Sequence, residues 1–434
     1  MISATLTPEK ITADLLPQRF GKRGIVWVSI LALICLIGAY AYYRQLTRGL
    51  VVTNMRDYVS WGIYISNFVF FVAISLVGSL ITAVLRLTGV HWSTPLTRIA
   101  EIIAASAIVF ASVIIVVDMG RPDRFLNLFF YGRLQSPIIW DVIVIGTYFF
   151  LSLLLLYFPL LPDLKILIAN KKQSSGWMNR LYRFMGSFWK GTSTQFKLTD
   201  RAITILCITI IPVAFAIHTV TSWLFATTYR PGWDSTNFGA YFISGAFLVG
   251  AGGVVVAMYV FRRVYKLEKY ITEFHFERMG RVVVMLALLY LYFNINEYLI
   301  PAFKMKKPEE AHLTTLFAGD EAPLFWFAIL TGMIIPIIIL LFRAGRKPFP
   351  MFIAGVMVVV GAWFKRYLIV TPTLMHPFLP MHDVPESYHH YFPSWEEWAI
   401  AMGSLSGALL IITFFARIFP IVPIHETIVE DEPH

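Results

Sequence analysis

The sequence predicts an all-α integral membrane protein with about ten transmembrane helices. Of its 434 residues, 57% are hydrophobic and only 14% are charged, whereas an ordinary soluble domain has about 25% charged residues. Ten separate stretches are long and apolar enough to cross about 30 Å of hydrocarbon. The composition therefore excludes a soluble enzyme, and the abundance of Phe, Tyr and Trp excludes a disordered or fibrous chain.

The ten expected spans follow one another from the N-terminus. They lie at 24–43, 61–85, 99–118, 139–159, 203–228, 237–261, 281–300, 323–342, 349–370 and 398–420. The residues before the first span carry acidic as well as basic side chains, and no small-residue cleavage site follows that span. We therefore expect the first span to be retained rather than removed as a signal peptide.

The distribution of Lys and Arg predicts the orientation of the chain. The N-terminus, the even-numbered connections and the C-terminus carry roughly twice as many Lys and Arg as the odd-numbered connections. The positive-inside rule then places both termini in the cytoplasm and the odd-numbered connections on the outer face. The long, basic 160–202 connection is expected to be an amphipathic linker beside anionic membrane lipid. The net charge of +10 is explained in this way and does not indicate nucleic-acid binding.

An internal repeat predicts two four-helix bundles, formed by spans 2–5 and 6–9. The second span opens with Trp-Gly-Ile-Tyr at 61–64 and the sixth with Phe-Gly-Ala-Tyr at 238–241. Because four spans separate the copies, both run in the same direction, as in parallel repeats. The expected segments are 1–23 (N-terminal segment), 24–60 (peripheral span 1 and a loop), 61–228 (first bundle), 229–370 (second bundle), 371–397 (outer loop) and 398–434 (peripheral span 10 and tail). In this alignment Asp141 corresponds to Phe327, so the two copies differ chemically.

Polar residues inside the spans are the candidate functional residues, since each charge in hydrocarbon costs about 2.5–3.5 kcal/mol on insertion scales. With about 1.5 Å of rise per residue, five of them lie within about 10 Å of the outer face: Asn67, Asp118, Asp141, Glu297 and Arg366. Tyr148 and His218 extend this group toward the midplane, and Glu101 lies at the inner end of its span. Arg366 is expected to pair with Glu297, Asp118 or Asp141. Asp118 and Asp141 also lie near helix ends, where a capping or dipole role is the alternative.

These residues favour quinone chemistry without haem. His218 is the only one of ten histidines expected within a span, whereas a transmembrane haem b needs two facing imidazoles. Two cysteines, Cys35 and Cys207, cannot hold an iron–sulfur cluster. A quinol needs only donors and acceptors for its oxygens, apolar walls and proton acceptors, and its electrons would leave for a cofactor in another protein.

We therefore predict three groups of site residues and no metal site. The catalytic group comprises Asp141, His218 and Asp118. The quinone-binding group comprises Asn67, Tyr148, His218, Arg366 and Asp141. The proton-path group comprises Glu101, Glu297 and Asp118.

Several motifs resemble the NrfD/polysulfide-reductase membrane-subunit family over nearly the whole chain. They are Trp-Gly-Ile-Tyr-Ile-Ser-Asn at 61–67, Gly-Arg-Pro at 120–122, Ser-Pro at 136–137 with Trp-Asp at 140–141, His-Thr-Val-Thr-Ser at 218–222, Pro-Gly-Trp at 231–233 and Tyr-Phe-Pro-Ser-Trp at 391–395. The ten-span form looks most like the quinol-oxidising subunits of alternative complex III. The sequence departs from the family pattern at Leu76, Asp118 and Leu224.

The resemblance implies a haem-free site for menaquinol or ubiquinol near the outer face of a bacterial inner membrane. It also implies an iron–sulfur partner subunit on that face, with a multihaem cytochrome c and a second NrfD-like subunit in the same complex. Three alternatives stay open: a proton-conducting subunit with a degenerate quinone site, an inert membrane anchor and, outside the family, a solute transporter.

Overall fold

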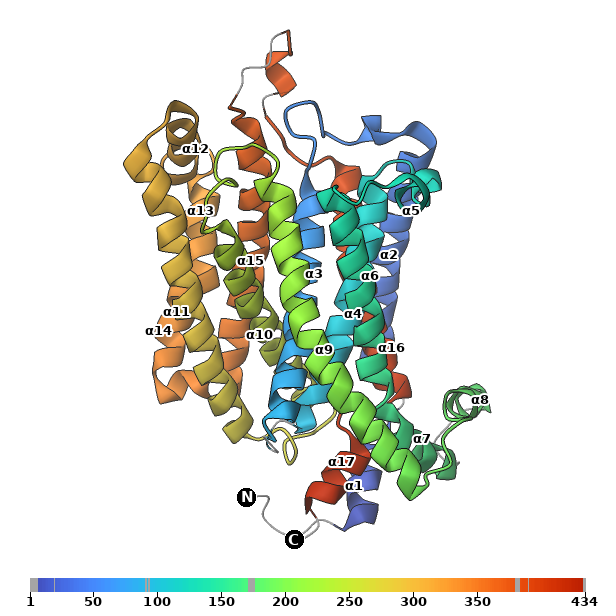
Figure 1. Ribbon diagram of the computed structural model, residues 1–434. Helices are drawn as coiled ribbons and strands as arrows, with labels where there is room; N and C mark the ends of the chain where they lie inside the picture. Colours follow the sequence, from blue (N-terminus) through green and yellow to red (C-terminus); the bar gives the residue numbers. More distant parts are fainter. Residues whose placement is uncertain are drawn as a thin grey trace.

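The computed structural model describes residues 7–18, 20–89, 92, 94–170, 176–378, 383–388 and 390–431, and every regular element within them is helical (Figure 1). Ten helices in the described part of the chain are long and apolar enough to cross a membrane. The prediction of an all-α, multi-pass membrane protein with about ten spans is therefore confirmed.

Nine of the ten spans are continuous helices. They are α2 (Lys22–Arg48), α3 (Ile63–Leu87), α4 (Thr94–Asp118), α6 (Pro137–Tyr157), α9 (Ser193–Ala226), α10 (Phe238–Val264), α11 (Glu273–Lys304), α15 (Pro348–Met375) and α16 (Trp395–Ile418). The eighth span consists of α13 (Ala322–Ile329), a π-helical turn (Leu330–Ile334) and α14 (Ile335–Leu341). Pro336 lacks the N–H that would bond to the Gly332 carbonyl in an α-helix, and a wider turn accommodates this loss.

Several span helices begin earlier than their apolar stretches predict. Helix α9 begins ten residues earlier than expected, at a capping box in which Thr192 and Gln195 satisfy each other's backbone N–H groups. Helix α11 likewise begins at a capping box of Thr272 and His275, so His275 joins the first turn of a span helix and His218 is no longer the only histidine in one. Hydropathy detects the apolar centre of a helix, whereas the first residue of the helix is determined by the polar capping residue before it.

The contacts arrange the spans in two groups. In the first group α3, α4, α6 and α9 pack on one another, and in the second α10 and α15 pack together with α11 and α13–α14. We call these groups the first and second bundles; α2 packs on α16 beside them. Whether the bundles arose from the expected repeat stays a prediction, as do the domain boundaries.

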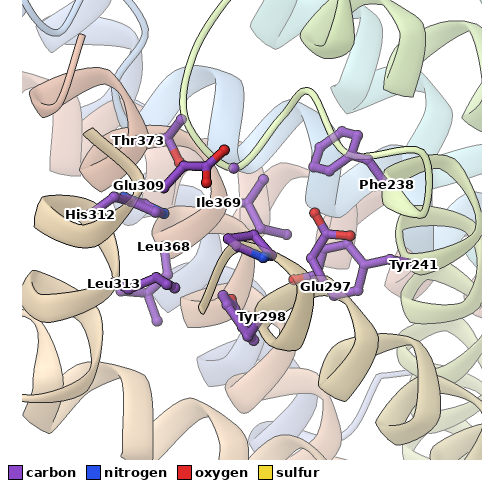
Figure 2. A pocket seen from close by; sticks show the side chains of 12 residues that line it. Phe238, Tyr241, Glu297, Tyr298, Glu309, His312, Leu313, Leu368, Ile369 and Thr373 are labelled. Carbon is purple, nitrogen blue, oxygen red and sulfur yellow. The ribbon is translucent and has the colours of Figure 1, made fainter. Parts of the chain in front are cut away.

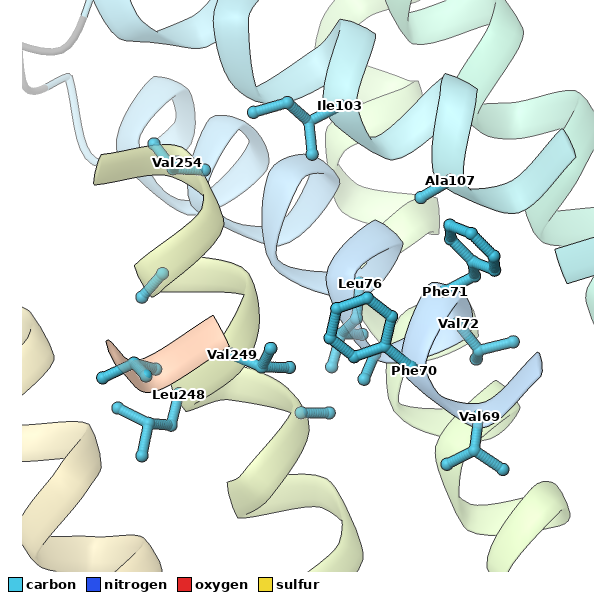
Figure 3. Packing of buried hydrophobic residues seen from close by; sticks show 14 of the residues in the cluster. Val69, Phe70, Phe71, Val72, Leu76, Ile103, Ala107, Leu248, Val249 and Val254 are labelled. Atoms are coloured by element: carbon cyan, nitrogen blue, oxygen red, sulfur yellow. The ribbon is translucent and has the colours of Figure 1, made fainter. Parts of the chain in front are cut away.

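Helix α3 lies at the junction of the two bundles, where it contacts α4, α9, α10 and α15. In Figure 3 its side chains Phe70 and Leu76 lie near Leu248 and Val249 of α10, while Phe71 lies on the side of Ala107 of α4. A helix that is hydrophobic all round is expected to be buried on all sides. The junction therefore forms the core of the molecule.

The molecule has two polar faces. Both termini lie on one of them, the termini face, with α1 (Pro8–Leu15), α7 (Leu160–Ala169), α8 (Gly176–Met185) and α17 (Ile424–Asp431) (Figure 1). The opposite loop face carries α5 (Asn127–Tyr131), α12 (Lys307–Phe317) and the described residues 383–388 and 390–394 before α16. Which face is cytoplasmic stays a prediction. Part of the expected 160–202 linker, residues 171–175, lies outside the described residues.

Candidate functional site

His218 on α9 is fully buried at the junction of the bundles. Its ring lies 6.0 Å, between centroids, from the ring of Phe242 on α10. One ring nitrogen interacts with the backbone of Ala214, one turn earlier on α9, and among the described residues neither nitrogen makes a hydrogen bond of good geometry. Buried imidazole nitrogens without partners are unusual in a folded protein, because each such group loses its hydration on burial. His218 therefore keeps at least one ring nitrogen available for a ligand.

Arg366 on α15 contacts the same phenylalanine. Its guanidinium carbon lies 4.7 Å from the centroid of the Phe242 ring, and Nη2 donates to the Phe242 carbonyl oxygen at 3.3 Å. A Cβ at Gly245 would lie 3.0 Å from Nη2, so this glycine makes room for the guanidinium. Nη1 is buried and has no hydrogen-bond partner within the described part of the chain. Arg366 is thus a buried cation with one donor unused.

The predicted ion pair of Arg366 is wrong. None of the ion pairs formed by the described residues includes Arg366. The expected acids are engaged or lie elsewhere: Glu297 accepts hydrogen bonds from other side chains, and Asp141 does so from Thr221. The guanidinium is held by a cation–π contact in place of a carboxylate.

Asn67 on α3 also has a free donor at this junction. Its Oδ1 accepts a hydrogen bond from Trp363 Nε1 at 2.6 Å, while its buried Nδ2 has no partner among the described residues. Trp363 precedes Arg366 by three residues on α15 and therefore lies on the same side of that helix. The structure thus brings three predicted residues, His218, Arg366 and Asn67, to the junction of α3, α9, α10 and α15. We call these three residues the junction site.

Asp141 lies one helical turn from this site. It is buried on α6, and its Oδ1 lies 2.7 Å from Thr221 Oγ1 on α9, three residues beyond His218. Thr221 Oγ1 also lies 2.8 Å from the Ile217 carbonyl oxygen. The threonine hydroxyl therefore links the carboxyl group of α6 to the helix that carries the imidazole.

Tyr148 and Asp118 lie apart from the junction site. The Tyr148 hydroxyl donates to the Ser75 carbonyl oxygen at 2.5 Å and lies 2.9 Å from Ser79 Oγ, so its hydrogen-bonding capacity is used between α6 and α3. Asp118 ends α4 beside the contact between Gln45 Nε2 and the Val117 carbonyl oxygen. Its buried Oδ1 has no partner among the described residues.

The two predicted proton-path glutamates lie at opposite faces. Glu101 on α4 is buried near the termini face, where its Oε1 lies 3.7 Å from Arg86 Nη2. Glu297 on α11 is buried near the loop face, where it accepts hydrogen bonds from Ser235 Oγ at 2.7 Å and Asn237 Nδ2 at 3.2 Å. Glu101 and Glu297 therefore do not form one site. The prediction of two separate half-paths requires this separation.

Aromatic rings cover the junction site toward the loop face. Phe225, near the loop-face end of α9, packs against Phe242 with centroids 5.9 Å apart and against Trp233 with centroids 4.9 Å apart. Trp61 stacks on Trp233 at 5.9 Å, and Trp233 Nε1 donates to the Ile369 carbonyl oxygen at 2.7 Å. These rings provide the apolar, water-excluding wall expected of a small-molecule site.

A second polar group in the second bundle was largely missed from the sequence. Figure 2 shows a small pocket between Glu297 and Tyr298 of α11 and Glu309 and His312 of α12. The volume of this pocket, about 20 Å³, is comparable to the space needed for one water molecule. Buried Lys365 donates to the Tyr298 hydroxyl at 2.6 Å beside it. The adjacent basic pair Lys365 and Arg366 could have indicated two sites, since neighbouring residues on a helix point in different directions.

His312 lies in the loop-face helix α12, outside the spans. Burial penalises its charged form and, with His376 nearby, lowers its pKa to about 3. The His312 and His376 rings lie 5.9 Å apart. Within the described residues, no three His, Cys, Asp or Glu side chains come together as metal ligands would.

Comparison with known proteins gives one family and several full-length relatives. The family described as polysulphide reductase, NrfD, matches residues 51–377. A putative membrane subunit of a dimethyl sulfoxide reductase from Halobacterium salinarum is 28% identical over 81% of this chain and 78% of its own length. A selenate reductase subunit of Mesobacillus selenatarsenatis is 22% identical over 91% and 94%, respectively. The menaquinone reductase integral membrane subunit of Nitratidesulfovibrio vulgaris is 22% identical over 95% and 96%.

Proposed function

This chain belongs to the NrfD family of polysulphide reductases, and on that premise we propose that it is the quinone-binding membrane subunit of a respiratory redox complex. In this proposal it oxidises a quinol near the loop face, binds no haem or iron–sulfur cluster and passes the electrons to a partner subunit. The relatives named as subunits of reductases support a subunit role, and the relative named menaquinone reductase supports a quinone as the substrate.

The observation that carries the proposal is the set of unused hydrogen-bonding groups at the junction site. Among the described residues, His218 has one ring nitrogen without any partner. Arg366 has a free Nη1 and Asn67 a free Nδ2. The two oxygens of a quinone accept hydrogen bonds, and those of a quinol also donate them. Arg366 and Asn67 can donate to one ligand oxygen each, while a neutral His218 can accept a proton from a quinol hydroxyl. A planar ring would lie against the neighbouring aromatic side chains, as in other largely apolar ligand sites.

Oxidation of a quinol releases two electrons and two protons. In the proposed mechanism His218 accepts the two protons from the ligand one after the other, and Asp141, one turn away beside Thr221, receives each before the next is transferred. Asp141 lies in the first turns of α6, whose N-terminal end is on the loop face. Protons would therefore leave on that face. The two electrons pass to iron–sulfur clusters of a partner subunit on the same face.

The proposal also assigns the orientation of the chain in the membrane, its substrate and its partner subunits. We place the loop face outside a bacterial inner membrane and both termini in the cytoplasm, because of the Lys and Arg asymmetry. The substrate is menaquinol or ubiquinol. The proposed complex also contains a multihaem cytochrome c and a second NrfD-like subunit, as in the assemblies that the sequence motifs resemble.

A second candidate function is proton conduction without quinone chemistry. It is favoured by buried ionisable groups near the two faces: Glu101 at one, and Glu297 and Lys365 at the other, where Lys365 donates to the half-buried Tyr298. Buried ionisable residues in spans commonly mark ion or proton routes. In this candidate Asp118 and Glu297 accept protons on the loop-face side, and the junction site is degenerate.

The test is binding of a quinone-site inhibitor to the purified complex. We expect one saturable site per chain that is lost in His218→Leu and retained in Tyr148→Phe. Tyr148 is the matched control because its buried hydroxyl already bonds to Ser75 and Ser79, away from the junction site. Full binding by His218→Leu, or no binding under saturating conditions, would contradict the quinone proposal and favour proton conduction. Loss of binding in Tyr148→Phe as well would place the ligand deeper in the first bundle.

A further inference from the structure

Helix α8, at the termini face, is held at the depth where two spans end. The hydroxyl of Tyr157, the last residue of α6, donates to the Met185 carbonyl oxygen of α8 at 2.7 Å. The Tyr182 hydroxyl of α8 donates to the carbonyl oxygen of Ile418, the last residue of α16. Where span helices end, the hydrocarbon of the bilayer gives way to the polar head-group region. Helix α8 therefore lies at this boundary, to one side of the bundles (Figure 1).

One side of α8 packs against the rest of the protein. Met178 and Tyr182 are buried in a cluster that also contains Leu164 of α7 and Phe419. The Tyr182 and Phe419 rings lie 5.9 Å apart, between centroids. Side chains four residues apart lie on the same side of a helix, so these contacts fix the rotation of α8 about its axis. The side chains on the opposite side therefore face away from the bundles.

The outward side of α8 carries an aromatic edge. Trp177 and Phe184 are 55% and 79% exposed, and Phe188, in the turn that follows α8, is 84% exposed. Residues seven apart lie almost in line on a helix with 3.6 residues per turn, so Trp177 and Phe184 share one edge. Exposed groups of large apolar side chains mark interaction surfaces, and Trp and Phe are typical of the apolar face of a helix that lies in a membrane surface.

A basic edge lies next to the aromatic edge. Arg180 and Arg183 are exposed and, three residues apart, are neighbours on the helix surface. Neither takes part in the ion pairs of the described residues. The surrounding sequence, 164–199, contains seven Lys or Arg and no Asp or Glu. The charge of this segment fits an anionic surface, and guanidinium groups match the oxygens of phosphates.

We propose that α8 is an in-plane membrane anchor whose partner is a layer of anionic phospholipid. Trp177 and Phe184 enter the outer part of the acyl region, about 5–10 Å deep as in other helices of this kind, and Arg180 and Arg183 bind the phosphates of the head groups. The anionic lipid expected beside the 160–202 connection is thereby assigned to particular side chains. The anchor is independent of the proposed quinone chemistry, because it needs no ligand at the junction site.

The first test measures the depth of the aromatic edge in the purified complex, reconstituted in nanodiscs of phosphatidylcholine and phosphatidylglycerol. A nitroxide is attached at Phe184→Cys or, as the matched control, at Ser187→Cys, which is exposed in the turn after α8. Both chains carry Ala in place of Cys35 and Cys207. We expect the label at position 184 to be more accessible to oxygen, which concentrates in hydrocarbon, and less accessible to a water-soluble nickel complex than the label at position 187.

Two results of this test would overturn the anchor. Equal or greater access of the nickel complex at position 184 than at position 187 would place the aromatic edge in water. A label at position 184 that is shielded from both reagents would show that a protein partner, and not lipid, covers this edge.

The second test measures which head groups surround the basic edge. A fluorophore at Ser187→Cys is quenched by spin-labelled phosphatidylglycerol or phosphatidylcholine with identical acyl chains, and we expect stronger quenching by phosphatidylglycerol. Each cation near an anionic surface strengthens the attraction about fivefold, so Arg180→Gln with Arg183→Gln should remove most of this preference. The matched control is Arg121→Gln with Arg124→Gln, exposed on the loop face, which should retain it. Equal quenching by the two lipids in the unaltered complex, or an unchanged preference in the α8 double variant, would contradict the proposal.

Discussion

Replacing Arg366 by Met tests the junction site through ligand affinity. Nη1 of Arg366 is buried and, among the described residues, has no hydrogen-bond partner. A quinone oxygen that accepts from Nη1 would form a hydrogen bond with a charged group, which contributes about 1.5–3 kcal/mol. Since about 1.4 kcal/mol corresponds to tenfold in Kd, Arg366→Met should raise the Kd of the quinone roughly 10- to 150-fold. Titration of the purified complex with a quinone-site inhibitor measures this change.

The same substitution should not destabilise the protein. Arg366 forms none of the ion pairs recorded among the described residues, so Met at this position leaves no buried carboxylate without its partner and removes the desolvation penalty of a buried guanidinium. We therefore expect weaker binding with an unchanged or higher Tm. Arg366→Lys keeps the charge but loses the planar fork and should bind the inhibitor with intermediate affinity. An unchanged Kd in Arg366→Met would refute the role of Arg366, and a fall in Tm together with the affinity would indicate a structural role.

Four further predictions concern other parts of the chain. Asp141→Asn should lower quinol-dependent electron transfer about 10²- to 10⁴-fold with normal assembly; near wild-type turnover would remove Asp141 from the proposed mechanism. An accessible tag at residue 175, outside the described residues, should be cytoplasmic and one at residue 385 external; labelling from the opposite sides would reverse the orientation. Asp163→Ala removes the only carboxylate paired with the fully buried Arg98 among the described residues, at 2.5 Å, and should destabilise the protein by about 3–5 kcal/mol. The loss is measured as faster proteolysis of the C-terminal helix, and an unchanged cleavage rate would contradict this. The pKa of His312 is lowered to about 3 by burial. The protein is therefore most stable above about pH 6.5, and protonation of His312 in the unfolded chain lowers the free energy of unfolding by about 2 kcal/mol at pH 5. The acid dependence of Tm should shrink in His312→Gln, and an identical dependence in that variant would exclude His312 as its source.

The number of spans could be predicted because the length of an apolar stretch is a local property. A run of about 20 apolar residues has few alternatives to a membrane helix, so all ten were found. The ends of the helices are decided by polar turns that hydropathy does not see. Helix α9 gains ten residues at the capping box of Thr192 and Gln195, and this Thr-x-x-Gln pattern was a readable signal. The π-helical turn before Pro336 depends on packing between helices and had no comparable signal.

The membership of the candidate site was less predictable, because it depends on the rotation of each helix about its axis. His218, Arg366 and Asn67 do meet at one junction, but depth in the membrane alone also grouped Tyr148 and Asp118 with them. Tyr148 is two turns below Asp141 on α6, yet its hydroxyl bonds to α3 at Ser75. Depth is read from position in a span, whereas direction is decided by packing that the sequence of one helix does not contain.

Helix α15 connects two polar regions. One is the junction site, and the other is the pocket of the second bundle. Arg366 lies on Phe242 beside the junction site, and its neighbour Lys365 donates to Tyr298 beside the pocket that Glu297 lines. Both are buried cations, and charges in a low-dielectric interior interact over several ångströms more strongly than in water. A proton gained or lost near Lys365 therefore changes the electrostatic environment of a ligand at Arg366. Quinone chemistry and proton conduction, the two proposed functions, need not exclude each other, because adjacent residues of one helix belong to both proposed sites.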